Sequence, residues 1–167
     1  CDALRSALPQ LDRPKEVLFD TARFDALRRL PFFGDFPDTQ LWETIHLSSW
    51  LEFSEGTAVF EEGSSGDSVY VIAKGEVVIT RSGAILNRLG PGECIGEIAF
   101  LDEVTHERTA TVRALSPLVL IEIPAAGLRN GSAELQAEFG RAFMRVMLKR
   151  IRNADERYLN LLRTPGA

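Results

Sequence analysis

The residues best suited to chemistry gather in one stretch, where the chain runs Gly90-Pro91-Gly92-Glu93-Cys94-Ile95-Gly96-Glu97. The strand pattern stops at Gly96, and the next residues indicate a short helix whose unpaired backbone N–H groups would attract an anion. Arg108 can return to the same place and offer a planar guanidinium, which binds two oxygens of a phosphate at once. These residue types predict a site for an anion.

An acidic residue, Glu97, lies inside the same stretch and needs its own explanation. A carboxylate beside a phosphate site would repel the ligand unless the carboxylate had a separate task. One such task is to accept a hydrogen bond from a sugar hydroxyl, as acidic residues do in dinucleotide-binding sites. The alternative is a structural ion pair between Glu97 and Arg108 that closes the loop, and the spacing alone leaves both interpretations open.

The elements that must position these residues follow from the apolar pattern, which divides the chain into three parts of one domain. Residues 1–50 form an N-terminal helical segment, because Leu27, Leu30 and Phe33 recur at helical spacing. Residues 51–124 hold short apolar runs between glycine turns, which is typical of a β-sandwich or small barrel. The expected strands are Thr57–Phe60, Ser68–Ile72, Glu76–Thr80, Ile85–Leu89, Thr109–Ala114 and Leu118–Ile123.

Residues 125–163 form a hinge and a long C-terminal helix, for which Ser132 is the expected N-cap. An apolar stripe recurs along this helix at intervals of three and four, and it comprises Leu135, Phe139, Phe143, Met147, Ile151, Ala154, Tyr158 and Leu162. Such a helix pairs with a second copy or lies along its own β-domain, and pairing is the favoured interpretation. The basic residues on another face indicate a solvated surface rather than a nucleic-acid site.

Composition excludes several classes of protein. The 167 residues and the net charge of −5 fit one domain and argue against a nucleic-acid binder, whose affinity depends on Lys and Arg. No apolar run is long enough to span a membrane. Two cysteines and two histidines, His46 and His106, are poor material for a zinc, iron–sulfur or haem site, so we expect no metal and no cofactor.

The same inventory argues against catalysis, because no pairing of a nucleophile with a base is indicated anywhere, and we expect no enzymatic activity. The two cysteines, Cys1 and Cys94, favour a reducing compartment, so a cytoplasmic location is expected, with Cys94 as a buried packing residue. The chain starts with Cys1 rather than Met, which favours a processed or excised piece of a longer protein.

Two motifs, in this order, resemble those of the cyclic nucleotide-binding domain family. Residues 63–77 resemble its glycine–aspartate hairpin and following strand, while Gly96-Glu97-Ile98-Ala99 and Arg108-Thr109-Ala110 are similar to the two halves of its phosphate-binding cassette. The resemblance covers residues 33–158 and implies an α+β fold: an antiparallel β-roll, or jelly roll, with N-terminal helices and a C-terminal lid and dimerisation helix. The span from Glu97 to Arg108 is slightly longer than the commonest family spacing.

The resemblance also implies a role for each site residue. Arg108 would hold the cyclic phosphate together with the backbone amides of Ala99 and its neighbours, and Glu97 would bind the ribose 2′-hydroxyl. The apolar wall against the base would consist of Val77, Leu86 and Leu89. The complete set of implied ligand-binding residues is Gly96, Glu97, Ile98, Ala99, Arg108, Thr109, Ala110, Val77, Leu86, Leu89, Arg150 and Asp155, the last two from the lid helix.

The base of the ligand stays open between cAMP and cGMP, with a slight preference for cGMP. The Thr109 hydroxyl can reach the amino group of guanine, and the Asp155 carboxylate can accept from guanine N1–H and N2–H together. We therefore expect a homodimeric regulatory sensor that switches an output outside this chain through its C-terminal helix. Two alternatives are the sensor half of a transcription regulator without its helix-turn-helix, and a degenerate domain that only dimerises.

Overall fold

The structure is a computed structural model that describes residues 13–102 and 104–163. Its helices are α1 (Arg13–Arg29), η3 (Pro31–Phe33), α2 (Asp38–Leu47), α3 (Glu97–Leu101), α4 (Ala125–Arg129) and α5 (Ala133–Arg163). Its strands are β1 (Ser49–Phe53), β2 (Ala58–Phe60), β3 (Val69–Lys74), β4 (Val77–Arg81), β5 (Ala84–Leu89), β6 (Cys94–Ile95), β7 (Thr111–Ala114) and β8 (Leu118–Ile123). Within the described ranges, no helix is both long and apolar enough to cross a membrane.

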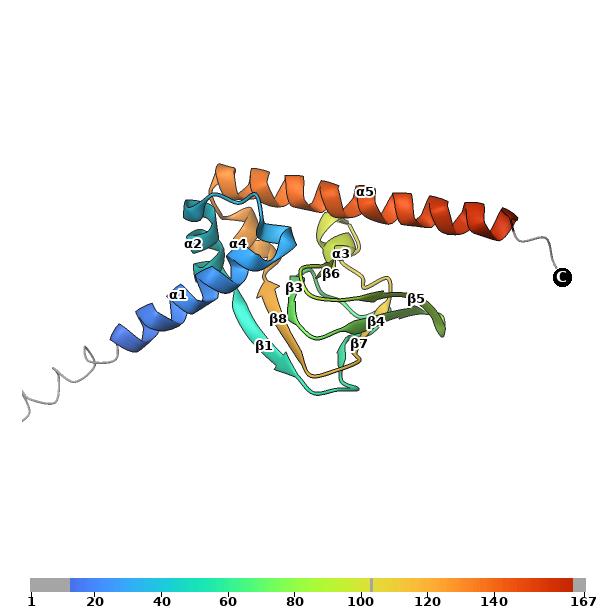
Figure 1. Ribbon diagram of the computed structural model, residues 1–167, viewed down its shortest axis with the longest axis horizontal. Helices are drawn as coiled ribbons and strands as arrows, with labels where there is room; N and C mark the ends of the chain where they lie inside the picture. The colour runs from blue at the N-terminus through green and yellow to red at the C-terminus, as the bar shows by residue number, and fades with distance from the viewer. Residues whose placement is uncertain (1–12, 103, 164–167) are drawn as a thin grey trace, which may run out of the picture.

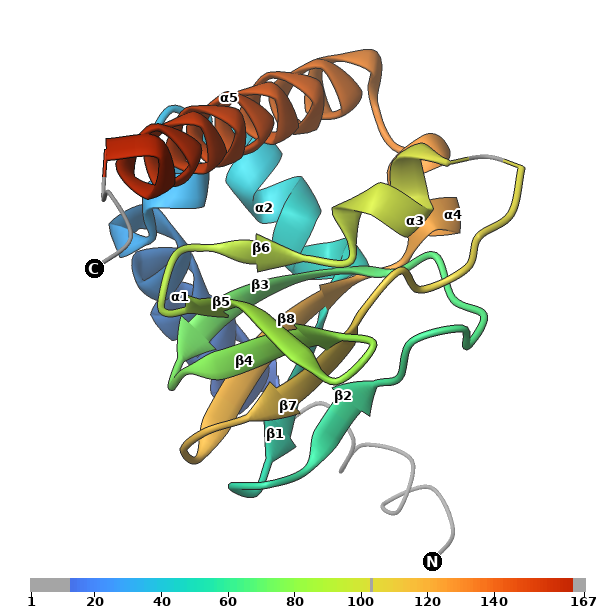
Figure 2. The same ribbon diagram turned by 90° about the vertical axis from the view of Figure 1, so that its right-hand side faces the viewer.

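The strands form two four-stranded antiparallel sheets, in the orders β1-β8-β3-β6 and β2-β7-β4-β5 (Figure 2). A core of apolar side chains draws on both sheets, and it comprises Ile72, Val77, Leu89, Ile95, Val112, Ala114, Leu118 and Leu120. This arrangement confirms the α+β fold with an antiparallel β-roll that the sequence predicted. Glycine turns separate the strands, as expected from their spacing.

The central strand of the first sheet, β8, explains why this part of the sequence is almost continuously apolar. Neighbouring residues of a strand face opposite sides, so Leu120 packs into the core of the roll while Ile121 packs against the helices. Its partner β3 divides in the same way, with Ile72 in the roll and Val71 among the helices. The first sheet is therefore covered on both faces.

The helical layer centres on an aromatic cluster that holds the first half of α5. Phe32, Phe33 and Phe36 contact Phe139 and Phe143 of α5 with ring centroids 5.2 to 6.1 Å apart. These five phenylalanines are nearly inaccessible to solvent. At this depth, they contribute much of the apolar burial that fixes α5 to the domain.

The start of α5 confirms the predicted N-cap, because the Ser132 hydroxyl accepts a hydrogen bond from the Leu135 N–H at 3.1 Å. Glu43 of α2 anchors this cap by accepting bonds from the Ser132 N–H and hydroxyl, both at 2.7 Å. From there α5 runs across the whole molecule and extends beyond the sheets (Figure 1). Two ion pairs hold its middle, Arg145 to Asp35 at 3.4 Å and Lys149 to Glu93 at 3.5 Å.

The predicted apolar stripe of α5 divides into parts with different surroundings. Leu135, Phe139 and Phe143 are buried in the protein's own core, which the domain-packing interpretation requires. Val146 and Met147, which follow, are half-buried. The large apolar side chains of α5 that are at least 48% exposed are Met144, Leu148, Ile151, Tyr158, Leu159, Leu161 and Leu162. The seam available to a partner therefore includes Met144 and Leu148, which the predicted stripe did not contain.

Candidate functional site

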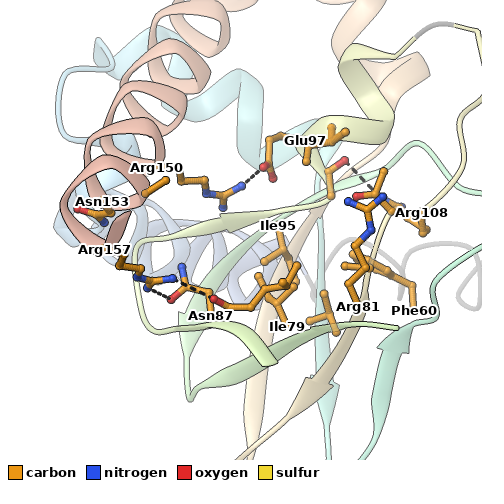
Figure 3. Close-up of a pocket in the computed structure, with 17 residues that line it drawn as sticks. Phe60, Ile79, Arg81, Asn87, Ile95, Glu97, Arg108, Arg150, Asn153 and Arg157 are labelled. Atoms are coloured by element: carbon orange, nitrogen blue, oxygen red, sulfur yellow. Dashed lines mark hydrogen bonds and ion pairs between the residues drawn. The ribbon is translucent and has the colours of Figure 1, made fainter. Parts of the chain in front are cut away.

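A cavity of about 280 Å³ lies where the second sheet, α3 and the far half of α5 meet (Figure 3). The residues that line it are Phe60, Ile79, Arg81, Leu86, Asn87, Ile95, Gly96, Glu97, Ile98, Arg108, Thr109, Ala110, Val112, Arg150, Asn153, Ala154 and Arg157. Eight of the residues expected from the sequence are in this set: Gly96, Glu97, Ile98, Arg108, Thr109, Ala110, Leu86 and Arg150. The two cassette segments and one residue of the long helix thus meet at one cavity.

The guanidinium of Arg108 is the central cation of the cavity, although the residue is only 4% exposed. It donates to the carbonyl of Ser68 at 2.9 Å and to the carbonyl of Gly96 at 3.3 Å. Its Cζ lies 4.3 Å from the ring centroid of Phe60, which is a close cation–π distance. Burial lowers the pKa of Arg108 from its ordinary value, but an arginine at this depth still carries its charge.

Against the effect of burial, the carboxylates of Asp67 and Glu122 favour the charged form of Arg108 and raise its pKa, but neither forms an ion pair with it. Its hydrogen-bond partners are carbonyl oxygens, and within the described residues no ion pair includes it. The structural ion pair between Glu97 and Arg108, which the spacing alone left open, is therefore not formed. A buried cation held by neutral carbonyls can accept an anion without first losing a carboxylate partner.

Gly96 allows Arg108 to lie against the start of α3. Its φ of 83° is a left-handed conformation that side chains disfavour, and a Cβ there would lie 2.8 Å from the carbonyl oxygen of Ser68. The same Cβ would also press on Nη1 of Arg108. Because α3 begins at the next residue, its first-turn backbone N–H groups have no acceptor within the helix. Both halves of the expected phosphate site are thus adjacent.

Glu97 is 1% exposed and pairs with the long helix instead of with Arg108. Nη1 of Arg150 donates to Oε1 of Glu97, and Nη2 of Arg150 donates to the carbonyl of Cys94 at 2.6 Å (Figure 3). The partner of the second oxygen, Oε2, is the Sγ of Cys94. This thiol is a weak donor, and its distance of 3.9 Å is long for a hydrogen bond. One carboxylate oxygen is thus engaged by α5 and the other remains available to a hydroxyl.

A second group of polar residues, which the sequence reading did not single out, closes the cavity where β5 meets α5. Nη1 of Arg157 donates to the carbonyl of Leu86 at 3.1 Å, and its Nη2 donates to Oδ1 of Asn87 at 3.3 Å. Asn153 lines the cavity from the same side of α5. A signal was present in the sequence, because Arg150, Asn153 and Arg157 are spaced at three and four and must share one helix face.

Four residues expected at the ligand are not among the lining residues. Val77 and Leu89 are opposite each other in the β4–β5 ladder and fill the core, so Leu86 alone of the three expected wall residues lines the cavity, together with Ile79, Ile95 and Val112. Asp155 is exposed on α5 and does not line the cavity. It follows Ala154, which does, but one residue turns the helix by about 100°. Ala99 lies within α3, and its side chain is outside the described part of the structure.

Cys94 lies at the edge of the site, where its carbonyl accepts a bond from Arg150. Cys94 is buried, and burial raises the pKa of its thiol to about 11, so the thiol stays protonated and unreactive at neutral pH. This agrees with the expected packing role. In the part of the chain that the structure describes, no three His, Cys, Asp or Glu side chains cluster as metal ligands would.

Two curated proteins of known name are similar to this chain in sequence. The chain is 33% identical over 96 residues to a cGMP-dependent protein kinase of Caenorhabditis elegans, covering 58% of this chain and 12% of the kinase. It is 28% identical over 123 residues to a CRP-like cAMP-activated global transcriptional regulator of Mycobacterium tuberculosis, covering 70% of this chain and 54% of the regulator. The chain thus spans about half the length of the regulator and about an eighth of the length of the kinase.

A solved structure shares the fold of this chain. A cyclic nucleotide-binding domain from Methylobacillus flagellatus superimposes with a TM-score of 0.72 over 89% of this chain and 86% of that one, at 20% identity. Residues 50–133, half of the chain, match the sequence model of the cyclic nucleotide-binding domain. This protein therefore belongs to the cyclic nucleotide-binding domain family.

Proposed function

We propose that this chain binds a purine 3′,5′-cyclic nucleotide in the cavity beneath α5 and passes its occupancy to an output through that helix. The observation that carries the proposal is Arg108, a cation that is 4% exposed and has no ion pair within the described residues. Burial of a charge without an ion-pair partner is costly, and an anionic ligand would offset that cost. The names of the relatives, one for cGMP and one for cAMP, support this ligand class.

In this proposal each part of the nucleotide meets a different wall of the cavity. The cyclic phosphate binds Arg108 and the first-turn amides of α3. The ribose 2′-hydroxyl donates to the free oxygen of Glu97, which Arg150 holds in place from α5. The base then extends between the apolar wall and α5, toward Asn87.

The proposed output lies outside this chain, and α5 is the element that would communicate with it. The far half of α5 rests on the domain mainly through polar bonds from Arg150 and Arg157, so a ligand that alters these bonds changes the position of the helix. We also propose that two copies pair through the exposed apolar residues of α5, which are spaced for a helix–helix seam. The chain acts in the cytoplasm, needs no cofactor and has no catalytic activity of its own in this proposal.

The test is isothermal titration calorimetry of the purified chain with cAMP and cGMP in separate titrations. Replacement of Arg108 by Ala removes at least two charge-assisted bonds to the phosphate, each worth about 1.5–3 kcal/mol, so no binding should be measurable at micromolar nucleotide. Arg108→Lys keeps the charge without the two-pronged geometry, and should bind more weakly than the parent.

Arg113→Ala is the matched control, because Arg113 is an exposed arginine of β7 that bonds the carbonyl of Gly56 outside the cavity. It should bind like the parent. Circular dichroism confirms that each variant is folded. If the parent binds neither nucleotide, the proposed function is wrong. If Arg108→Ala binds as the parent does, the site is elsewhere.

A further inference from the structure

We infer that the cavity selects guanine over adenine through Asn87, whose side-chain amide is fixed as a donor by Arg157. This inference rests on the proposed function, since it names the base of the nucleotide that the cavity binds. The relevant residues lie on the side of the cavity opposite Arg108, where β5 approaches α5 (Figure 3). A nucleotide with its phosphate on Arg108 must direct its base toward this side.

The orientation of the Asn87 amide follows from its partners. Oδ1 accepts two hydrogen bonds, one from the backbone N–H of Arg88 at 2.9 Å and one from Nη2 of Arg157 at 3.3 Å. Both partners can only donate, so the amide oxygen and not the nitrogen must face them. Arg157 is itself held by its second bond, to the carbonyl of Leu86. Within the described residues no hydrogen bond engages Nδ2, which leaves its two hydrogens for a ligand.

This constraint reverses the usual preference of an asparagine. A free asparagine suits adenine, because its oxygen accepts from N6 and its nitrogen donates to N7. In this protein the oxygen of Asn87 is occupied, so the side chain can only donate. On the edge that carries N7, guanine offers the two acceptors O6 and N7, whereas adenine offers N7 beside the N6 donor. Donors at this wall therefore match guanine and oppose the amino group of adenine.

The other polar side chains of the cavity do not oppose this preference. Arg81, at the end of β4, also lines the cavity, but it lies on the same side as Arg108, away from Asn87 (Figure 3). Asn153 can turn its amide to suit either base, so it does not discriminate. Asp155, which the sequence suggested as the residue that accepts from guanine, does not line the cavity. We therefore assign the preference for guanine to Asn87 and Arg157 instead of Asp155. The atoms of guanine that are recognised are then O6 and N7 instead of N1 and N2.

The experiment compares affinities for cGMP, cAMP and inosine 3′,5′-cyclic monophosphate by calorimetry on the same purified chain. The inosine nucleotide keeps O6 and N7 but lacks the N2 amino group, so it separates recognition by Asn87 from recognition by Thr109. A matched pair of base contacts discriminates roughly 5- to 150-fold. We expect cGMP and the inosine nucleotide to bind at least about tenfold more tightly than cAMP.

Two substitutions test the mechanism of this selectivity. Asn87→Ala should bring the affinities for cGMP and cAMP close together. Arg157→Ala frees Oδ1 of Asn87 and should move the ratio at least about tenfold toward cAMP. Both residues are near the protein surface, so we expect both variants to fold. Arg152→Ala, an exposed arginine of α5 outside this cavity, is the matched control and should keep the parent ratio.

The outcomes separate this inference from the proposed function. Loss of all binding in the parent chain refutes the proposed function itself. Binding of cAMP as tightly as cGMP leaves the proposed function standing and overturns the selectivity. If the inosine nucleotide binds like cAMP, the amino group of guanine is what is read, and Asn87 is not the selecting residue. An unchanged ratio in Arg157→Ala overturns the part assigned to Arg157.

Discussion

Replacing Arg150 with alanine should weaken both the fold and nucleotide binding, because this one guanidinium joins α5 to two groups of the cavity wall. It donates to Glu97 and to the carbonyl of Cys94, the latter at 2.6 Å. The Glu97 side chain is 2% exposed, so the variant would leave its charge buried without a partner. Arg152→Ala, an exposed position of the same helix, is the matched control.

The magnitude follows from the burial of the two partners. Removal of one member of a fully buried ion pair costs about 3–5 kcal/mol. The Arg150 side chain is 29% exposed, and water entering the vacated space would solvate part of the Glu97 charge. We therefore expect a loss of about 2 kcal/mol in the free energy of unfolding, which is about 4–8 °C in Tm for a chain of this length.

The effect on binding should be the same for both nucleotides. Arg150 holds one oxygen of Glu97 and thereby aims the other at the ligand, and the ribose that this oxygen would bind is common to cAMP and cGMP. We expect affinities about tenfold lower, roughly the worth of one hydrogen bond to a charged group. Thermal unfolding followed by circular dichroism and calorimetry with each nucleotide measure the two effects.

Three results would refute this reasoning. An unchanged Tm would mean that the ion pair contributes nothing to the fold. Tighter binding in Arg150→Ala would mean that Arg150 competes with the ribose for Glu97, which is the opposite of a positioning role. A loss confined to one of the two nucleotides would mean that Arg150 contacts the base.

Gly96→Ala should lower stability and nucleotide affinity more than Gly83→Ala. Both residues have positive φ, but of the two only a Cβ at Gly96 would meet neighbouring atoms. Denaturant unfolding and calorimetry measure the two losses, and equal losses in the two variants would contradict this prediction. The pKa of Cys94, raised by burial from about 9 to about 11, predicts a contribution to stability that is complete below pH 9. That contribution should fall by about 2–3 kcal/mol as pH rises to 11, and Cys94→Ala should lack this part of the pH dependence in chemical unfolding. Ile151→Glu should turn a dimer into a monomer in sedimentation velocity while Arg152→Glu should not, and a dimer that survives Ile151→Glu would exclude the α5 seam.

The local pattern was sufficient for most strands and for the long helix. Alternating apolar residues between glycine turns predicted six strands close to their observed bounds, and Ser132 was correctly predicted as the cap of α5. Strand β1 was missed, because the expected boundary between the helical segment and the strands, after residue 50, falls inside Ser49–Phe53. Strand β6 has only two residues, and no periodicity can be detected over that length.

Site residues could be predicted from the sequence where they belong to a short motif. They could not be predicted where the site forms by contact between elements that are distant in the sequence. Glu97 and Arg108 belong to such motifs, and the structure brings both to one cavity. Asn87 and Arg157 come together only because α5 lies across β5, and nothing in either local sequence indicates this contact. Asp155 was expected in the cavity because the resemblance located the right turn of α5 but not the direction of each side chain around the helix.

The helix α5 is held firmly in its first half and loosely in its second half. The first half is embedded in the aromatic cluster around Phe139 and Phe143. Residues 147–163 form an arm beyond this cluster that is about 25 Å long at 1.5 Å per residue. A tilt of about 10° at the cluster would carry the tip of the long arm about 4 Å. That displacement exceeds the length of the bonds from Arg157, while the phenylalanines at the pivot stay buried. Figure 1 shows how far this part of α5 extends. A change of a few ångströms beneath the arm is thereby amplified at its far end.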